Sequence, residues 1–213
     1  VTERALPDAR DGLKPVQRRI LYGMLTRRFL STRSTVKSAE IVGSILGDYH
    51  PHGDASVYDA MVRMAQDFTM RYPLIEGQGN FGSIDGDPPA AYRYTEARLS
   101  PLAEALMADI DKETVSLRPT YKQDPRVLEA DYMPGRIPPV VNPSSGIAVG
   151  LSTNILPHNL TEVVRACIAL LDKPSMSVEQ LMTYIKGPDF SSGGTVMGQD
   201  GIRDYLTSGK GRI

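Results

Sequence analysis

The chain has 213 residues, of which 41% are hydrophobic and 23% are charged, and its formal net charge at pH 7 is -1. These values are typical of one or two globular domains and exclude a disordered chain. No apolar run approaches the roughly 18 residues that a membrane-spanning helix needs. The single cysteine, Cys167, excludes an internal disulfide and a cysteine-rich zinc site.

Both ends of the chain favour a fragment of a longer protein. The sequence begins at Val1 with neither an initiator methionine nor a signal-peptide pattern, and it stops at Gly-Lys-Gly-Arg-Ile without a closing element. A single cysteine fits a reducing compartment. We therefore expect a cytoplasmic protein that makes no membrane contact.

Positive charge is concentrated near the N-terminus. Residues 1–37 carry nine basic and three acidic side chains. A local excess of this kind favours a nucleic-acid partner in spite of the near-neutral total, the alternative being a solvated helix face. The basic residues are Arg4, Arg10, Lys14, Arg18, Arg19, Arg27, Arg28, Arg33 and Lys37.

Three helices are predicted in the first third of the chain. The first runs from Lys14 to about Phe29, with Pro15 in its first turn and one apolar stripe. The second is capped by Ser34 or Thr35, runs to about Leu46 and stops at Gly47, and the third is capped by Asp54 and runs to about Asp67; these positions suit Ser, Thr, Asp and Gly. Two short helices around a tight turn after a basic helix resemble a helix-turn-helix.

The texture changes over residues 72–99, where glycines and a Pro-Pro pair punctuate short apolar runs. This pattern indicates strands and loops. Residues 92–99 alternate with a strand-like period. Ser100 then caps another helix, with Pro101 at its first position. A strand ribbon after a helix-turn-helix is the layout of a winged helix.

From about residue 115 the pattern changes again. A proline-rich irregular stretch reaches residue 146, a small apolar run covers Gly146–Leu151, and helices are predicted over 160–171 and 177–185. We place a domain boundary near 115–130. The predicted fold class is α/β (α+β), with a winged-helix domain over 1–120 and the start of an α/β domain over 121–213.

Arg93 and Tyr94 stand side by side in the alternating stretch. An enzyme that cuts and reseals DNA needs a nucleophile that keeps the phosphodiester energy in a covalent bond, and tyrosine can serve. It also needs positive charge beside the phosphate. An isolated Arg-Tyr pair is more often a strand with a half-buried aromatic side chain.

Four sequence blocks resemble the A subunits of bacterial type IIA DNA topoisomerases, in the family's order and at near-family spacing. They include Arg-Ala-Leu-Pro-Asp-Ala-Arg-Asp-Gly-Leu-Lys-Pro from Arg4, Tyr-His-Pro-His-Gly-Asp from Tyr49, Gly-Gln-Gly-Asn-Phe-Gly-Ser from Gly77 leading into Arg-Tyr-Thr-Glu, and Ser-Ser-Gly-Ile-Ala-Val-Gly from Ser144. They span nearly the whole chain. The run that starts at Gly77 resembles gyrases more than topoisomerase IV.

The resemblance implies catalytic roles. Tyr94 would attack a DNA phosphate and form a 5′-phosphotyrosyl link, and Arg93 would stabilise the transition state. His52 and Arg4 would position or neutralise the phosphate, with His50 as a further candidate. For the two histidines, a turn held by local hydrogen bonds is the structural alternative.

The resemblance also implies DNA contacts away from the tyrosine. Lys14 and Arg19 would bind backbone phosphates. Ile147 would be an apolar wedge that inserts between base pairs and bends the DNA. The alternative for Ile147 is a core position in a glycine-flanked turn.

Family members work as A2B2 heterotetramers, so the expected partners are double-stranded DNA, the B subunit, and another A subunit. The resemblance implies that Mg²⁺ and ATP are both bound by the B subunit, and no ligand cluster or Walker-type loop is evident in this sequence. A gyrase-like enzyme would alter DNA supercoiling and a topoisomerase IV would decatenate DNA. Residues 121–213 would begin the family's tower domain.

The sequence departs from the family at three points. Ala55 stands where many members have a serine, on a helix that contacts quinolone drugs through a water–metal bridge together with an acidic residue, here Asp59. Gln17 replaces a common histidine. Pro143 follows Asn142 where Asn-Gly is usual, and it restricts the loop before the expected wedge.

Two other classes of protein share parts of this pattern. A winged-helix transcription factor would explain the helix-turn-helix and the basic start, but it would leave Arg93 and Tyr94 without a role. A tyrosine recombinase or relaxase also uses a tyrosine, but with its histidine and arginine motifs in a different order.

Overall fold

The computed structural model describes residues 2–213. Over this part of the chain it contains eight α-helices and seven short strands, the strands forming three small antiparallel sheets. The expected mixture of helices and strands is confirmed. Within residues 2–213, no helix combines the length and apolar character that crossing a membrane would require.

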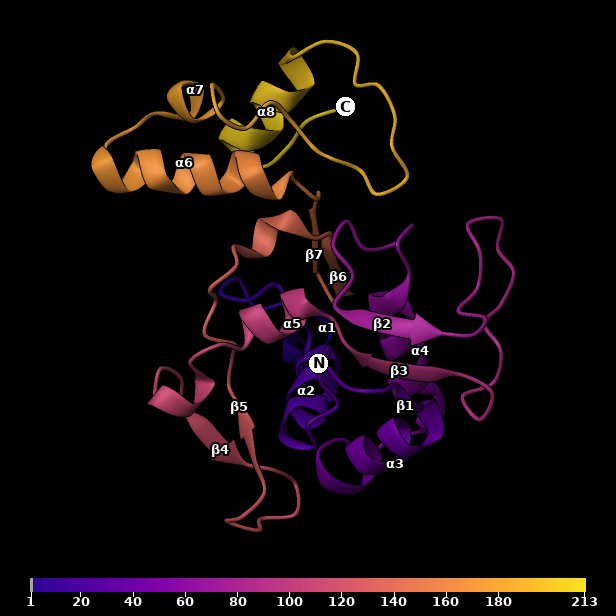
Figure 1. Ribbon diagram of the computed structural model, residues 1–213. Helices are drawn as coiled ribbons and strands as arrows, with labels where there is room; N and C mark the ends of the chain where they lie inside the picture. The colour runs from indigo at the N-terminus through magenta and orange to yellow at the C-terminus, as the bar shows by residue number, and fades with distance from the viewer. Residues whose placement is uncertain (1) are drawn as a thin grey trace.

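The first third of the chain contains four helices (Figure 1): α1 (Thr2–Ala5), α2 (Pro15–Thr26), α3 (Ser38–Asp48) and α4 (Asp54–Ala65). Pro15 opens α2 as predicted, and the side chain of Gln17 accepts a hydrogen bond from the Lys14 backbone N–H at 2.9 Å. The helix ends before Phe29 because Arg28 adopts a left-handed φ of 59°.

The predicted start of the second helix is wrong. Neither Ser34 nor Thr35 caps it, because Val36–Lys37 form the short strand β1 and α3 begins only at Ser38. The helix also continues past Gly47 to Asp48. Strand pairing with a segment far along the chain therefore overrides the local capping signal.

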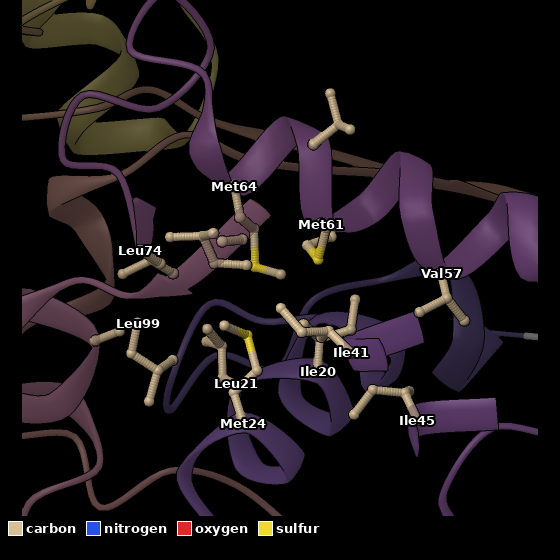
Figure 2. Close-up of a cluster of buried hydrophobic side chains, with 14 of the residues drawn as sticks. Ile20, Leu21, Met24, Ile41, Ile45, Val57, Met61, Met64, Leu74 and Leu99 are labelled. Atoms are coloured by element: carbon tan, nitrogen blue, oxygen red, sulfur yellow. The ribbon is translucent and has the colours of Figure 1, made fainter. Parts of the chain in front are cut away.

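The apolar faces of α2, α3 and α4 meet in one core, which the strands complete (Figure 2). Each fully buried aliphatic side chain contributes about 1.5–3 kcal/mol. The side chains at the centre are Ile20, Leu21, Met24, Ile41, Ile45, Val57, Met61, Met64, Leu74 and Leu99.

A buried ion pair fixes the segment before α2. The Asp11 carboxylate accepts hydrogen bonds from Nε and Nη2 of Arg18 at 2.7 and 2.9 Å. It also accepts from the backbone N–H groups of Leu13 at 2.9 Å and Met133 at 2.8 Å. The side chain of Asp11 is fully buried and that of Arg18 nearly so. The Asp11 carboxylate thus joins the segment before α2 to the loop at Met133, which lies more than half the chain's length further along the sequence.

A three-stranded sheet covers one edge of these helices. β1 (Val36–Lys37) and β2 (Ile75–Gln78) flank β3 (Glu96–Leu99), with Gly77 opposite Ala97. Only the last half of the predicted 92–99 strand is a strand. Residues 92–94 form a turn, in which the Tyr94 N–H donates to the Ala91 carbonyl at 2.9 Å. The predicted cap after it is confirmed, because the Ser100 hydroxyl accepts from the Ala103 N–H at the start of α5 (Pro101–Leu106).

The stretch from 115 to 159 is more ordered than predicted. β4 (Leu117–Pro119) and β5 (Leu128–Ala130) form one hairpin, and β6 (Ser144–Ala148) and β7 (Leu151–Ile155) form another. A 3₁₀ turn over Ile110–Lys112 precedes the first hairpin and another over Pro139–Val141 precedes the second.

Three helices lie together at one end of the molecule, beyond the β6–β7 hairpin (Figure 1): α6 (Leu160–Asp172), α7 (Val178–Leu181) and α8 (Asp200–Ser208). The first was predicted, the second is much shorter than the predicted 177–185, and the third was not predicted. The Tyr72 hydroxyl accepts from the first helical N–H of α6 at 2.8 Å, and Arg71 pairs with Asp189 at 2.9 Å. The loop after α4 therefore anchors this group.

Candidate functional site

Tyr94 lies on the exposed turn before β3. Its side chain is 67% exposed, so the phenol hydroxyl is open to solvent. The Arg93 guanidinium lies over the Tyr94 ring, 5.1 Å from its centre, within the range of a cation–π contact. The next residue, Thr95, is fully buried. A phenol side chain and a positive charge thus stand together on a turn whose following residue is held in the core.

Asp54 ties this turn to helix α4. The Tyr92 hydroxyl donates to Oδ2 of Asp54 at 3.0 Å, and this bond raises the pKa of Tyr92. The prediction that Asp54 is the N-cap is wrong, because Gly53 occupies the cap position and Asp54 is the first helical residue. A carboxylate in the first turn still interacts favourably with the helix dipole.

The Tyr-His-Pro-His-Gly-Asp turn joins α3 to α4 and brings both histidines to Arg4. The Arg4 guanidinium donates to Nε2 of His52. The His52 backbone N–H donates to the His50 carbonyl at 2.8 Å, and the two rings meet edge to face with centroids 4.5 Å apart. The local hydrogen bonds expected of a turn are present, and so is a cationic group beside them.

His50 is buried in this turn and its ring is neutral near pH 7. Burial, together with the positive charge of the nearby Arg19, lowers its pKa to about 4. The Arg19 guanidinium lies 3.0 Å from Nδ1 of His50, which as a neutral ring nitrogen can accept from it. His50 therefore carries no positive charge toward a phosphate.

Arg19 is held by a carboxylate from the other half of the chain. Its Nε lies 2.5 Å from Oε2 of Glu129 on β5, and its Nη2 donates to Oε1 at 3.1 Å. Since the guanidinium already has these partners and His50, the geometry favours a supporting role at the histidine over a direct phosphate contact. Lys14, by contrast, is the N-cap residue of α2 and is half-buried.

Ile147 lies near the tip of the β6–β7 hairpin and is 85% exposed, so the interpretation of this residue as a core position is wrong. Val149 and Leu151 beside it are also exposed. Gly150 has a φ of 75°, which allows the tight connection between the strands. An apolar tip of this kind in water indicates a contact surface.

The base of this hairpin packs on the segment that carries Arg4. A side-chain carbon at Gly146 would lie 2.3 Å from the Ala5 carbonyl oxygen, so no other residue fits there without movement. The Ser144 hydroxyl donates to the Gly12 carbonyl at 2.9 Å. The hairpin that carries Ile147 and the segment that carries Arg4 therefore pack directly against each other.

The Asn142-Pro143 departure does not loosen the loop before the hairpin. The Asn142 side chain accepts from the Tyr72 N–H at 2.7 Å and donates to the Tyr72 carbonyl at 2.9 Å. Two such bonds to one residue hold the loop in a single position. Pro143, at the next position, has no backbone N–H, and these two bonds do not require one there.

Ala55 and Asp59 both lie on the exposed face of α4, one turn apart. The opposite face, with Val57 and Met61, is buried in the core. The structure brings Arg4, the two histidines and Arg19 together at the α3–α4 connection. The Arg93-Tyr94 turn is tied to the start of α4 through Tyr92 and Asp54, and Ile147 stands on the separate hairpin. Among the described residues no group of three or more His, Cys, Asp and Glu side chains could hold a metal.

Sequence reasoning missed the buried hydroxyl groups behind the turn. Tyr58 falls among the apolar residues of α4, and its ring is buried in the core. Its hydroxyl nevertheless donates to the Ala90 carbonyl at 2.7 Å and lies 2.9 Å from the Thr95 hydroxyl. The available signal was that the hydroxyl of a buried tyrosine usually has a hydrogen-bond partner.

Comparison with known families identifies the class of protein. The model of the family of DNA gyrase/topoisomerase IV A subunits matches residues 4–213. The chain therefore belongs to this family, and the resemblance to type IIA topoisomerase A subunits is confirmed.

Three individual relatives of the chain are all DNA gyrase A subunits. The chain is 57% identical over 214 aligned residues to the DNA gyrase A subunit of Kosmotoga olearia, covering 100% of this chain and 26% of that protein. It is also 57% identical to the DNA gyrase A subunit of Thermotoga maritima, again with 100% and 26% coverage. For the same protein of Campylobacter jejuni the identity is 57%, over 99% of this chain and 24% of that protein. The chain spans about a quarter of the length of these relatives.

Proposed function

We propose that this chain is the N-terminal breakage–reunion part of a gyrase A subunit, which cuts and reseals double-stranded DNA while its supercoiling is changed. The observation that carries the proposal is the exposed Tyr94 side chain with the Arg93 guanidinium over its ring, on a turn whose following residue is fully buried. The family membership supplies the reaction that such a pair would perform.

The chemistry conserves one phosphodiester bond. The phenol oxygen of Tyr94 loses its proton and bonds to a DNA phosphorus, and the bond from that phosphorus to the 3′ oxygen breaks. The departing 3′ oxygen takes up a proton, and resealing reverses each change. Arg93 stabilises the charge that develops on the phosphate.

Arg4 supplies a second positive charge. Its guanidinium is bound to His52, which lies in the turn before α4, and His52 would position the phosphate. Neutral His50, backed by Arg19, buttresses the same turn. Lys14 would bind a backbone phosphate of the duplex, because such contacts position DNA without reading its sequence.

The first domain has the arrangement of a winged helix. In this proposal α3 and α4 form the helix-turn-helix, and the β1–β3–β2 sheet with the turn before β3 forms the wing that carries Tyr94. We assign residues 1–120 to this domain and residues 121–213 to the start of a tower domain. The exposed face of α4 would lie against DNA as a recognition helix does.

The complete enzyme requires partners. We propose that two A subunits and two B subunits assemble around the DNA, acting in the cytoplasm. Mg²⁺ and ATP would be bound by the B subunit, and Mg²⁺ supplies charge stabilisation at the phosphate when it is bound. Each A subunit would contribute one tyrosine, so that both strands are cut.

Ile147 would enter the DNA as a wedge. We expect Ile147→Ala to reduce DNA bending and to lower the cleavage rate by about tenfold, because a wedge offsets an unstacking cost of a few kcal/mol. The end-to-end distance of a doubly labelled duplex measures the bend. Stability should hardly change, since the side chain is exposed. Leu171→Ala on α6, also an exposed apolar residue, is the matched control; equal bending by both variants would remove Ile147 from the DNA contact.

Ala55 would weaken quinolone inhibition. We expect Ala55→Ser to lower the quinolone concentration that traps cleaved DNA by about 2- to 10-fold, since it restores one hydrogen-bonding hydroxyl beside Asp59. A titration of trapped complexes with each enzyme measures the change. Ala108→Ser, beyond the end of α5, is the matched control. No gain in sensitivity would show that this face of α4 does not hold the drug.

The proposal is tested by reconstitution. The full-length A subunit that contains this chain is mixed with its B subunit, Mg²⁺, ATP and relaxed plasmid, and the reaction is stopped with detergent. We expect a covalent protein–DNA adduct, attached through a 5′ phosphate and mapped to Tyr94 by peptide mass, together with negative supercoiling. Decatenation without supercoiling would indicate topoisomerase IV. DNA binding without any adduct would contradict the proposed cleavage chemistry.

A further inference from the structure

Buried hydroxyl groups hold the backbone on both sides of the reactive turn. Thr95, directly after Tyr94, donates from its hydroxyl to the Ser38 hydroxyl at 2.8 Å, and its carbonyl accepts from the Ser38 N–H at 2.9 Å. Both residues are fully buried. Two bonds between the same pair attach the turn firmly to the first residue of α3.

Helix α4 holds the other side of the turn. The Tyr58 hydroxyl donates to the Ala90 carbonyl at 2.7 Å, where the chain enters the turn, and lies 2.9 Å from the Thr95 hydroxyl, where the chain leaves it. The Tyr58 and Tyr92 rings also meet edge to face, with centroids 5.7 Å apart. One phenol therefore touches both ends of the turn that presents Tyr94.

The exposed position of Tyr94 makes this attachment consequential. With 67% of its surface in solvent, the side chain is held mainly by its own backbone and by Arg93. In-line attack on phosphorus requires a nucleophile placed to within a fraction of an ångström, and an error of about 1 Å can cost about 100-fold in rate. A turn whose backbone is fixed by buried hydrogen bonds therefore limits the misplacement of the phenol.

We propose that Tyr58 and Thr95 are positioning residues, whose hydroxyls fix the Tyr94 turn for attack and couple it to α4. The inference rests on the proposed function. Apolar side chains of the same shape would fill the space, but directional hydrogen bonds between buried groups select one arrangement. Tyr58 stands beside Asp59 and one turn after Ala55 on the face turned from solvent, so a shift of α4 on DNA would reach Tyr94 through it.

The test removes single hydroxyls from the full-length A subunit, reconstituted with its B subunit. We expect Tyr58→Phe and Thr95→Val to lower the single-turnover rate of adduct formation by about 10- to 100-fold while the Kd for DNA stays within roughly twofold of wild type. Thr95→Ser keeps the hydroxyl and should restore the rate to near wild type.

Tyr49→Phe is the matched control. Tyr49 is as buried as Tyr58, and its hydroxyl lies 3.3 Å from the Thr26 hydroxyl rather than at the turn that carries Tyr94. If Tyr58→Phe lowers the rate no more than Tyr49→Phe does, the inference is overturned. Thr95→Val at the wild-type rate would also overturn it, because valine keeps the shape of threonine and removes only the hydroxyl. If Tyr58→Phe does not fold, the two Thr95 variants decide.

These outcomes are separate from failure of the proposed function. A wild-type enzyme that forms no adduct at Tyr94 contradicts the function itself. A wild-type adduct, with unaltered rates in Tyr58→Phe and Thr95→Val, contradicts only the positioning role.

Discussion

Tyr94→Phe is expected to abolish covalent attachment to DNA, with a loss of about 10⁴-fold or more in cleavage, as for removal of other essential nucleophiles. The phenyl ring that remains has no oxygen to bond to phosphorus. The fold should be unaffected, because the side chain is exposed on a turn whose backbone is fixed by its neighbours. Detergent-trapped adduct and plasmid supercoiling measure the loss, and filter binding should show that DNA is still bound.

Tyr184→Phe provides the control for this change. Tyr184 is likewise exposed but lies after α7, in the helical group at the far end of the molecule. We expect its variant to cleave at the wild-type rate. An adduct that persists in Tyr94→Phe, mapped to another tyrosine such as Tyr92, would contradict the assignment of the nucleophile.

Asp11→Ala is expected to destabilise the protein by about 3–5 kcal/mol, the usual cost of leaving a buried ion-pair partner uncompensated. The change removes an acceptor for two guanidinium bonds and two backbone N–H groups. Arg18 would keep only its bond to the Leu13 carbonyl while remaining buried. Urea unfolding followed by circular dichroism, with the slope of the transition checked, measures the difference.

Asp8→Ala is the matched control for stability. Asp8 also pairs with an arginine, Arg10, and hydrogen bonding to Arg10 lowers the pKa of Asp8 to about 2. This pair is exposed to water, so its loss should matter far less than the loss at Asp11. Equal destabilisation by the two variants would show that burial does not set the strength of these ion pairs.

Local signals in the sequence predicted several elements correctly. Pro15 begins α2 and Ser100 caps α5, because both depend on a few neighbouring residues. The elements that were missed depend on distant pairing. β1 has two residues and exists through its register with Ala97 and Glu96, which no local period reveals.

The candidate site shows the same division. Resemblance to a family pointed to Tyr94, Arg93 and the histidines, and the structure brings His52 to Arg4 although 48 positions separate them in the sequence. The alternation that suggested a strand through Tyr94 misled, since the exposed aromatic side chain lies on a turn. Polar contacts inside a core, such as that of Tyr58 with Thr95, depend on the tertiary arrangement and are silent in a hydrophobic pattern.

The missing side chain at Gly146 has a mechanical consequence. Because the hairpin backbone lies directly against the Ala5 carbonyl, with no space between, a force applied at the Ile147 tip passes to the short helix that bears Arg4. If Ile147 and Arg4 have the roles proposed for them, deforming the duplex at one place and gripping its phosphate at another would be a single motion, transmitted through touching main chains rather than through a flexible tether.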